Sequence, residues 1–281
     1  MENWTETYRG TVSAWECDIV EHFTIAYYFE KFADATRNFV ELLGVADNLL
    51  PSVGAAGSRV HVAFQHELRA GSAFHIVSAI VALDADRMQL GHQLIDSAAG
   101  RTVSWVSETL PLPKALTQAE RTRLAGLAVA WPGPEVPQPL TTLPQLGALT
   151  CRERVKPSEI DEAGYLSASD HVHRFSGAGM HFLTSIGMNG TYMSENRRGF
   201  STFMLDFVVT DRARPGERTD VHTAPARLGN TSMAYLHRML AADGRPLASM
   251  LQSGVHLDLD VRRPTPLPDQ VRANIEAILG K

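Results

Sequence analysis

Residues 15–35 read WECDIVEHFTIAYYFEKFADA, and this stretch decides the fold. It gathers four polar side chains, those of Cys17, Asp18, Glu21 and His22, within six positions. Apolar residues then recur at helical spacing, which predicts a helix over Ile25–Leu43. Because a helix that is so apolar must be covered in water, we expect it to lie across the concave face of its own antiparallel sheet.

The same order of features returns 143 residues further along the chain. The matched pairs are Val12 and Val155, Asp18 and Asp161, Phe32 and Phe175, Ala35 and Ala178, Phe39 and Phe182, Leu43 and Ile186, and Gly44 and Gly187. In both halves a strand-like segment comes first, followed by an Asp, a short loop, a helix and a terminating Gly. The chain is therefore predicted to be a tandem repeat.

Downstream of each helix, apolar and polar residues alternate between turn residues, which predicts strands. In the first half these strands are Ser58–Arg69, Ser72–Leu83, Arg87–Asp96 and Arg101–Leu112. In the second half they are Gly199–Thr210, Glu217–Leu228, Ser232–Ala242 and Leu247–Leu257. One strand, one long helix and four more strands in each half predict an α+β fold.

We expect two domains, at residues 1–112 and 148–260. Residues 113–147 are rich in Pro, Leu and Ala and are predicted to form a linker with a short helix at Gln118–Ala130. The tail, residues 261–281, is predicted to contain a helix at Asp269–Leu279, with an Asp at its N-cap. A homo-oligomer beyond the two fused halves is left open.

The composition is that of an ordinary globular protein, with 44% hydrophobic and 20% charged residues. A formal net charge of −5 argues against nucleic acid as a partner. The first ten residues, MENWTETYRG, lack the pattern of a signal peptide, and no apolar run is long enough for a membrane helix, so we expect a cytoplasmic protein with no membrane partner. With only Cys17 and Cys151, neither a disulfide framework nor a cysteine-based zinc site is expected.

The loop before each helix resembles that of hotdog-fold acyl-CoA thioesterases of the 4-hydroxybenzoyl-CoA type. That loop reads Asp-x-x-Gly-His-x-Asn, with a Tyr four residues after the Asn. The first half has Asp18-Ile-Val-Glu21-His22-Phe23-Thr24 followed by Tyr28. The second half has Asp161-Glu-Ala-Gly164-Tyr165-Leu166-Ser167 followed by His171. The resemblance implies a double hotdog, in which each long central helix is wrapped by an antiparallel sheet and one chain supplies both halves of a dimer.

The resemblance also implies hydrolysis of an acyl-CoA substrate without a cofactor. Asp18 and, separately, Asp161 match the catalytic carboxylate, which attacks the thioester directly or activates water as a general base. His22 would orient the thioester or stabilise charge. Backbone N–H groups near Thr24, at the start of the helix, would stabilise the oxyanion because they lack partners within the helix. Further substrate contacts are assigned to Tyr28, His66 and Tyr165.

Each of these residues also has a structural interpretation. An Asp before a helix often caps it or shapes a turn, and Tyr28 on the helix face could simply pack. His171 and His173 are two apart, a spacing that points side chains to different sides of a helix, so no metal site is expected. Because both motif copies are altered, a hotdog module that binds acyl-CoA or another ligand without turnover is the alternative function. Whether one or both half-sites work stays open.

Overall fold

The computed structural model describes residues 3–18, 20–45, 49–50, 53–112, 116–140 and 143–280. The chain divides into two compact units, each described by itself. The first comprises Met1–Pro137 with the short segments Ser167–Ser169 and Val208–Arg212. The second comprises Gln138–Leu166, Asp170–Phe207 and Ala213–Lys281.

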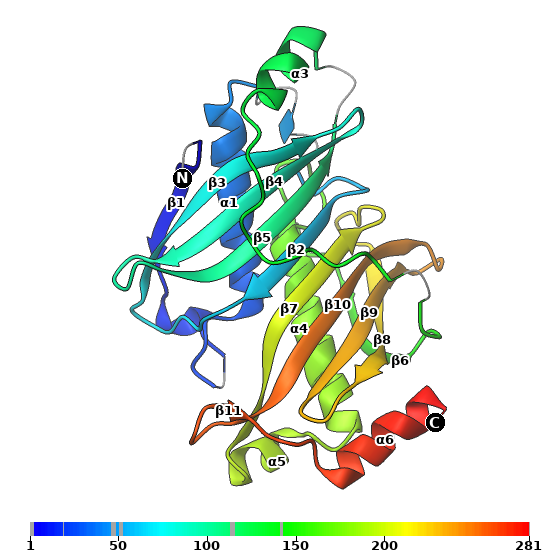
Figure 1. Cartoon of the computed structure of the whole chain (residues 1–281). Helices are drawn as coiled ribbons and strands as arrows, with labels where there is room; N and C mark the ends of the chain where they lie inside the picture. The colour runs from blue at the N-terminus through cyan, green and yellow to red at the C-terminus, as the bar shows by residue number, and fades with distance from the viewer. Residues whose placement is uncertain are drawn as a thin grey trace. The chain divides into compact units, whose positions relative to one another are not determined.

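The first unit is built on an antiparallel sheet with the strand order β1-β3-β4-β5-β2 (Figure 1). The strands are β1 (Thr5–Thr11), β2 (Arg59–Phe64), β3 (Ala73–Leu83), β4 (Arg87–Asp96) and β5 (Arg101–Pro111). Helix α1 (Ile25–Leu42) packs against β1 and β3. Short connections between β3, β4 and β5 make these three strands neighbours, as expected for successive hairpins.

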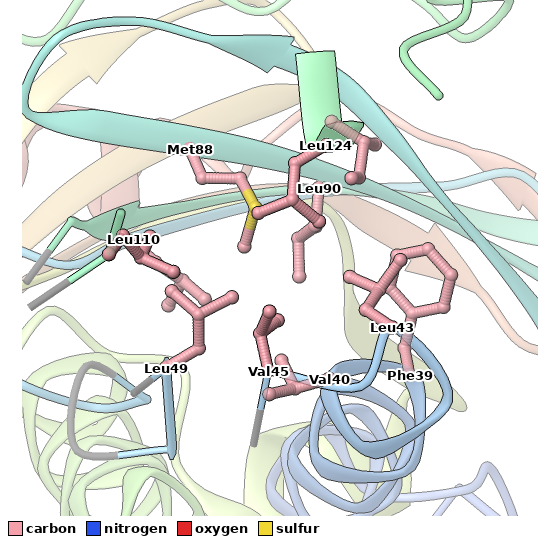
Figure 2. Packing of buried hydrophobic residues seen from close by; sticks show 11 residues of the cluster. Phe39, Val40, Leu43, Val45, Leu49, Met88, Leu90, Leu110 and Leu124 are labelled. Atoms are coloured by element: carbon pink, nitrogen blue, oxygen red, sulfur yellow. The ribbon is translucent and has the colours of Figure 1, made fainter. Parts of the chain in front are cut away.

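Helix α1 buries one broad face against this sheet. At one end of the unit, Phe39 and Val40 of α1 point toward Met88 and Leu90 of β4, and Leu124 of α3 (Gln118–Ala125) closes the cluster (Figure 2). The opposite side of α1 is exposed; its exposed residues are Glu30, Asp34, Asn38, Glu41 and Leu42. The expected covering of the helix by its sheet is thus partial, because charged or polar residues recur every three to four positions along the outer side.

The second unit repeats this arrangement. Its sheet has the order β7-β10-β9-β8-β6, and β11 pairs with β10. Its elements are β6 (Ala148–Arg154), α4 (Ala168–Ser185), α5 (Gly190–Glu195), β7 (Arg198–Val209), β8 (Arg218–Leu228), β9 (Ser232–Ala241), β10 (Pro246–Asp258), β11 (Arg263–Pro264) and α6 (Asp269–Leu279). Phe182 of α4 packs on the Tyr235 ring of β9 at 5.1 Å. Val271 and Ile275 of α6 join the same core cluster.

Most expected elements agree with the structure to within one or two residues. The strand expected at Ser58–Arg69 is an exception, because β2 ends at Phe64. There the N–H groups of Gln65 and His66 both donate to the Val103 carbonyl, at 2.8 and 3.2 Å, which breaks the ladder. The next residues leave the sheet, and the Leu68 carbonyl accepts from Phe23 N–H at 2.8 Å.

The short helix in the linker is also shorter than expected. Helix α3 ends at Ala125 instead of Ala130, because Gly126 is its C-cap and Val129 has already turned to donate its N–H to Ile80 of β3 at 2.9 Å. Residues 113–115 and 141–142 of the expected linker lie outside the described residues. The short elements α5 and β11 were not predicted. No helix in the described part of the chain is long and apolar enough to cross a membrane.

A chain of buried polar side chains crosses the first sheet beneath α1. Thr7 of β1 hydrogen-bonds Ser78 of β3 at 2.7 Å, and Ser78 hydrogen-bonds His92 Nδ1 of β4 at 2.7 Å. On the other side of the ring, His92 Nε2 lies 3.4 Å from Glu108 Oε2 of β5. Thr36 of α1 donates to the same carboxylate oxygen at 2.5 Å. This chain ties the helix to four strands through groups that are almost inaccessible to water.

The second sheet carries a matching chain with two differences. Thr150, Thr223 and His237 Nδ1 follow one another at 2.7 and 2.8 Å, as Thr7, Ser78 and His92 do. Gln252, however, takes the place of Glu108. In each sheet this residue lies two positions beyond the one that pairs with the buried His on the adjacent strand. The helix position of Thr36 is Gly179, 143 residues on. Complete burial lowers the pKa of His237 to about 3, so this ring is neutral.

Candidate active site

The loop before α1 is closed around the Asp18 carboxylate. Asp18 Oδ1 accepts hydrogen bonds from the N–H groups of Val20 and His22, at 2.9 and 3.0 Å. Asp18 N–H in turn donates to the His22 carbonyl at 2.8 Å. Glu21 takes a left-handed conformation with φ 65°, which closes the turn. The Asp18 carboxylate is therefore fixed in position and exposed to solvent.

The loop before α4 has the same hydrogen bonds. Asp161 Oδ1 accepts from Ala163 and Tyr165 N–H at 3.0 and 3.1 Å, and Asp161 N–H donates to the Tyr165 carbonyl at 2.7 Å. Gly164, with φ 80°, matches Glu21. The Asp and Gly of the motif thus have a backbone explanation. The Asp organises the turn, and the Gly position needs a left-handed residue.

A buried ion pair anchors each loop to its helix. In the first half, Lys31 Nζ of α1 lies 3.1 Å from Glu16 Oε1. In the second half, Arg174 of α4 donates to Glu159 Oε2 at 2.8 Å. Both glutamates also accept a backbone N–H three residues earlier, each at 2.7 Å. The pairs were not predicted, although Glu16 with Glu159 and Lys31 with Arg174 obey the 143-residue offset.

The anchoring carboxylate of the second half is held ionised. Partial burial alone would raise the pKa of Glu159, but hydrogen bonds from Arg174 and from the backbone and side chain of Lys156 lower it to about 2. For Lys31, desolvation opposes the charged form, yet the hydrogen bonds that its ammonium group donates to Glu30 and Glu16 raise the pKa above its usual value. Both loops are therefore held by charged pairs at neutral pH.

The His22 side chain is turned toward the segment that follows β2. Its Nε2 lies 2.9 Å from Glu67 Oε2, and the ring is mostly buried. Arg69 lies 3.9 Å from Glu67 Oε2 and also 3.9 Å from Glu21 Oε2. The backbone bond from Phe23 to Leu68 brings this segment beside the loop. The pairing of Glu67 with His22 was not predicted, and the sequence holds no local signal for it.

The other expected site residues lie in different surroundings. Thr24 is the N-cap of α1, and its N–H is engaged with the Glu16 carbonyl at 2.8 Å. Ile25 is partly exposed and Ala26 is completely buried, so the first-turn N–H group left for an oxyanion is that of Ile25. Tyr28 is buried against Phe23 at a ring distance of 4.4 Å, and burial raises the pKa of its phenol. Its environment is that of a packing residue.

The remaining two expected site residues are His66 and Tyr165. His66 is exposed just past the end of β2. Tyr165 lies in the second loop, where the Arg214 guanidinium sits 5.9 Å from its ring centroid. The structure thus joins Asp18 with His22 in one loop and Asp161 with Tyr165 in the other.

Metal ligands are not gathered in the part of the chain that the structure describes. Within it, no group of three or more His, Cys, Asp or Glu side chains is placed to hold a metal ion. His171 is buried in α4, where its ring lies 5.7 Å from that of Phe207.

An Asp-centred loop that leads into a long helix on an antiparallel sheet, present twice in one chain, defines a tandem hotdog protein of the thioesterase type. The chain belongs to the Thioesterase-like superfamily, whose family model matches residues 12–131 and 155–275. The two matches coincide with the two repeats.

Solved structures with the same fold span almost the whole chain. An acyl-ACP thioesterase from Bacteroides thetaiotaomicron superposes with a TM-score of 0.68 at 8% identity, covering 90% of this chain and 98% of that one. The 12:0-ACP thioesterase from Umbellularia californica gives a TM-score of 0.68 at 10% identity, covering 94% and 95%. At such identities the likeness establishes the fold alone. No curated protein matches the sequence significantly.

Proposed function

We propose that this protein hydrolyses an acyl-CoA thioester to the free acid and CoA, using Asp18 in the first loop. The observation that carries the proposal is the position of Asp18. Its carboxylate is exposed, fixed by two backbone N–H groups, and placed just before the first turn of α1 in a member of a thioesterase superfamily. Both bonds use Oδ1, so Oδ2 is the oxygen that reaches the substrate.

Two routes are open to this carboxylate. As a general base, Asp18 takes a proton from water while the water oxygen bonds to the carbonyl carbon; the C–S bond then breaks, and the leaving thiolate recovers the proton. As a nucleophile, Asp18 displaces the thiolate to form a mixed anhydride, which water hydrolyses in a second step. In both routes the N–H group of Ile25, at the start of α1, stabilises the oxyanion, aided by the positive end of the helix dipole.

The remaining expected residues have secondary roles in this proposal. His22 stabilises charge beside Asp18, while Thr24 and His66 shape the approach of the acyl group and Tyr28 packs against Phe23 of the same loop. Asp161 and Tyr165 form a second loop of the same geometry, and we expect it to contribute less because it has no imidazole at the His22 position. The superfamily match supports thioester chemistry, and both structural relatives described above are named as acyl-ACP thioesterases.

The test is thiol release from a panel of short, aromatic, branched and cationic acyl-CoA substrates, with acyl-ACP as a comparison. Asp18→Asn keeps Oδ1 as the acceptor for the Val20 and His22 amides, so the loop keeps its shape while the carboxylate is lost. Asp161→Asn is the matched change in the second loop. We expect Asp18→Asn to lower kcat by about 100-fold or more, in the range of general-base catalysis, and Asp161→Asn to lower it less. Full turnover by Asp18→Asn would refute the assignment.

A second candidate function is binding of an acyl thioester without turnover. It is favoured by one observation: the hydrogen bonds of Asp18 and Asp161 are those of turn-forming residues, and they are the same in both loops. Thermal stabilisation of the parent protein by acyl-CoA, with no thiol released, would favour this function over hydrolysis.

A further inference from the structure

The two loops differ in the residues that face them from the neighbouring segment. Phe23 N–H donates to the Leu68 carbonyl at 2.8 Å, and Leu166 N–H donates to the Ala213 carbonyl at 2.9 Å. Leu68 therefore corresponds to Ala213, and the residue before it, Glu67, corresponds to Arg212. His22 corresponds to Tyr165 by the 143-residue offset. A His with a Glu in the first half is thus replaced by a Tyr with an Arg in the second.

In the first half these two residues are in direct contact. His22 Nε2 and Glu67 Oε2 are 2.9 Å apart, a hydrogen-bonding distance, and the His22 side chain is 12% exposed against 38% for Glu67. A carboxylate only accepts hydrogen bonds, so the shared proton resides on Nε2 of the imidazole. By accepting this hydrogen bond, the carboxylate also holds the ring in one orientation.

The pair is not needed to build the loop. The second loop has the same Asp-centred turn and the same bond to the neighbouring segment, yet it carries neither the His nor the Glu. The fold therefore forms this loop with either combination. What the pair adds to the first loop is an oriented imidazole on His22, the residue whose backbone N–H donates directly to the Asp18 carboxylate.

We propose that Glu67 is a positioning residue for the hydrolysis assigned to Asp18: it holds His22 with the proton on Nε2 and so makes the first loop the working half-site. This inference rests on the proposed thioesterase function. Glu67 acts through His22 and does not touch the reacting atoms. Arg69, at 3.9 Å from Glu67, shares the carboxylate from the solvent side.

The test compares Glu67→Gln, Glu67→Asp and His22→Gln on the best acyl-CoA substrate. Glu67→Gln keeps an acceptor for Nε2 but removes the charge, and we expect kcat to fall roughly 10-fold or more while KM changes less than about threefold. Glu67→Asp keeps the charge and should restore part of kcat. Adding Glu67→Gln to His22→Gln should cause no further loss, because the Glu acts only through the ring. Glu6→Gln, an exposed glutamate paired with Arg9, is the control and should keep parent kcat.

Several results would overturn the inference. The inference fails if Glu67→Gln keeps the parent kcat, or if this change raises only KM. It also fails if adding Glu67→Gln to His22→Gln lowers kcat as much as Glu67→Gln lowers it in the parent. If Glu67→Gln does not fold, the imidazole ¹⁵N resonances of His22 in the parent decide, since a proton on Nδ1 alone excludes the proposed orientation. The two proposals can fail separately. Loss of activity in Asp18→Asn with parent activity in Glu67→Gln refutes this inference alone, whereas a parent without thioesterase activity refutes both.

Discussion

Thr36→Val tests the buried polar chain that joins α1 to its sheet. Thr36 Oγ1 donates to Glu108 Oε2 at 2.5 Å and lies 3.4 Å from His92 Nε2, and all three side chains are buried. Val has the same shape as Thr, so the change removes one donor and leaves packing intact. Leaving a buried acceptor without its donor costs about 1–3 kcal/mol, and the extra buried methyl recovers less than about 1 kcal/mol. We expect the free energy of unfolding to fall by about 1.5 kcal/mol.

Urea unfolding followed by tryptophan fluorescence measures this change in the first unit, to which α1 belongs. All four tryptophans, at positions 4, 15, 105 and 131, lie in the first unit, so the signal reports its unfolding. Thr122→Val is the matched control, because the Thr122 hydroxyl bonds only the Gln118 carbonyl one turn earlier on the exposed surface of α3; it should change stability by less than about 0.5 kcal/mol. A loss below about 0.5 kcal/mol in Thr36→Val would refute the reasoning. So would a double variant with Glu108→Gln whose effects simply add.

Three further predictions concern the anchors and turns of the two loops. Glu159 has a pKa of about 2, below its ordinary 4.5, so its contribution is complete above about pH 4.5 and is lost as the pH falls toward 2. This pKa shift corresponds to roughly 3 kcal/mol of stability, which solvent screening reduces to about 1–2 kcal/mol. The stability difference between the parent and Glu159→Gln, measured by hydrogen exchange, should shrink between pH 6 and pH 3.5. A constant difference would contradict the assignment to Arg174 pairing. Lys31→Met leaves a buried carboxylate without its cation and should cost about 2 kcal/mol in urea unfolding followed by tryptophan fluorescence, whereas a neutral result would mean that the pair contributes nothing. Gly164→Ala, at φ 80°, should cost about 1 kcal/mol by hydrogen exchange of the second loop, and unchanged protection would show that the turn tolerates a side chain.

The strands and long helices could be predicted because the patterns that indicate them occur in both halves of the sequence. Alternation over residues 87–96 and helical spacing over residues 25–42 are strong patterns, and the repeat supplies a second, independent copy of each. Features that depend on one contact were missed. The end of β2 is set by two N–H groups that share the Val103 carbonyl, and no pattern in the sequence predicts that bulge.

The site was predictable only in its local part. The Asp18 loop is a short motif, so its position before the helix follows from the sequence. Glu67 is 45 residues from His22, and the pair forms only because a backbone bond to Leu68 brings the two segments together. The buried chain of Ser78, His92 and Glu108 was missed for the same reason. Each is one of several polar residues in its strand, and the sequence alone gives no sign that neighbouring strands align these three.

Comparing the two repeats distinguishes positions that the fold requires from positions at which the two halves differ. Asp18 with Asp161, and Glu16 with Glu159, are kept in both halves, and the turn and anchor geometry explains them completely. The repetition of the Asp is therefore no argument for catalysis, because the turn alone requires it. His22 and Glu67 are replaced in the second half, although the Asp-centred turn and its bond to the neighbouring segment are kept. Gln252 replaces Glu108 at the matching register, so the fold does not require these three residues. A unique working half-site must depend on such residues, which makes the contrast between Asp18→Asn and Asp161→Asn more informative than either variant alone.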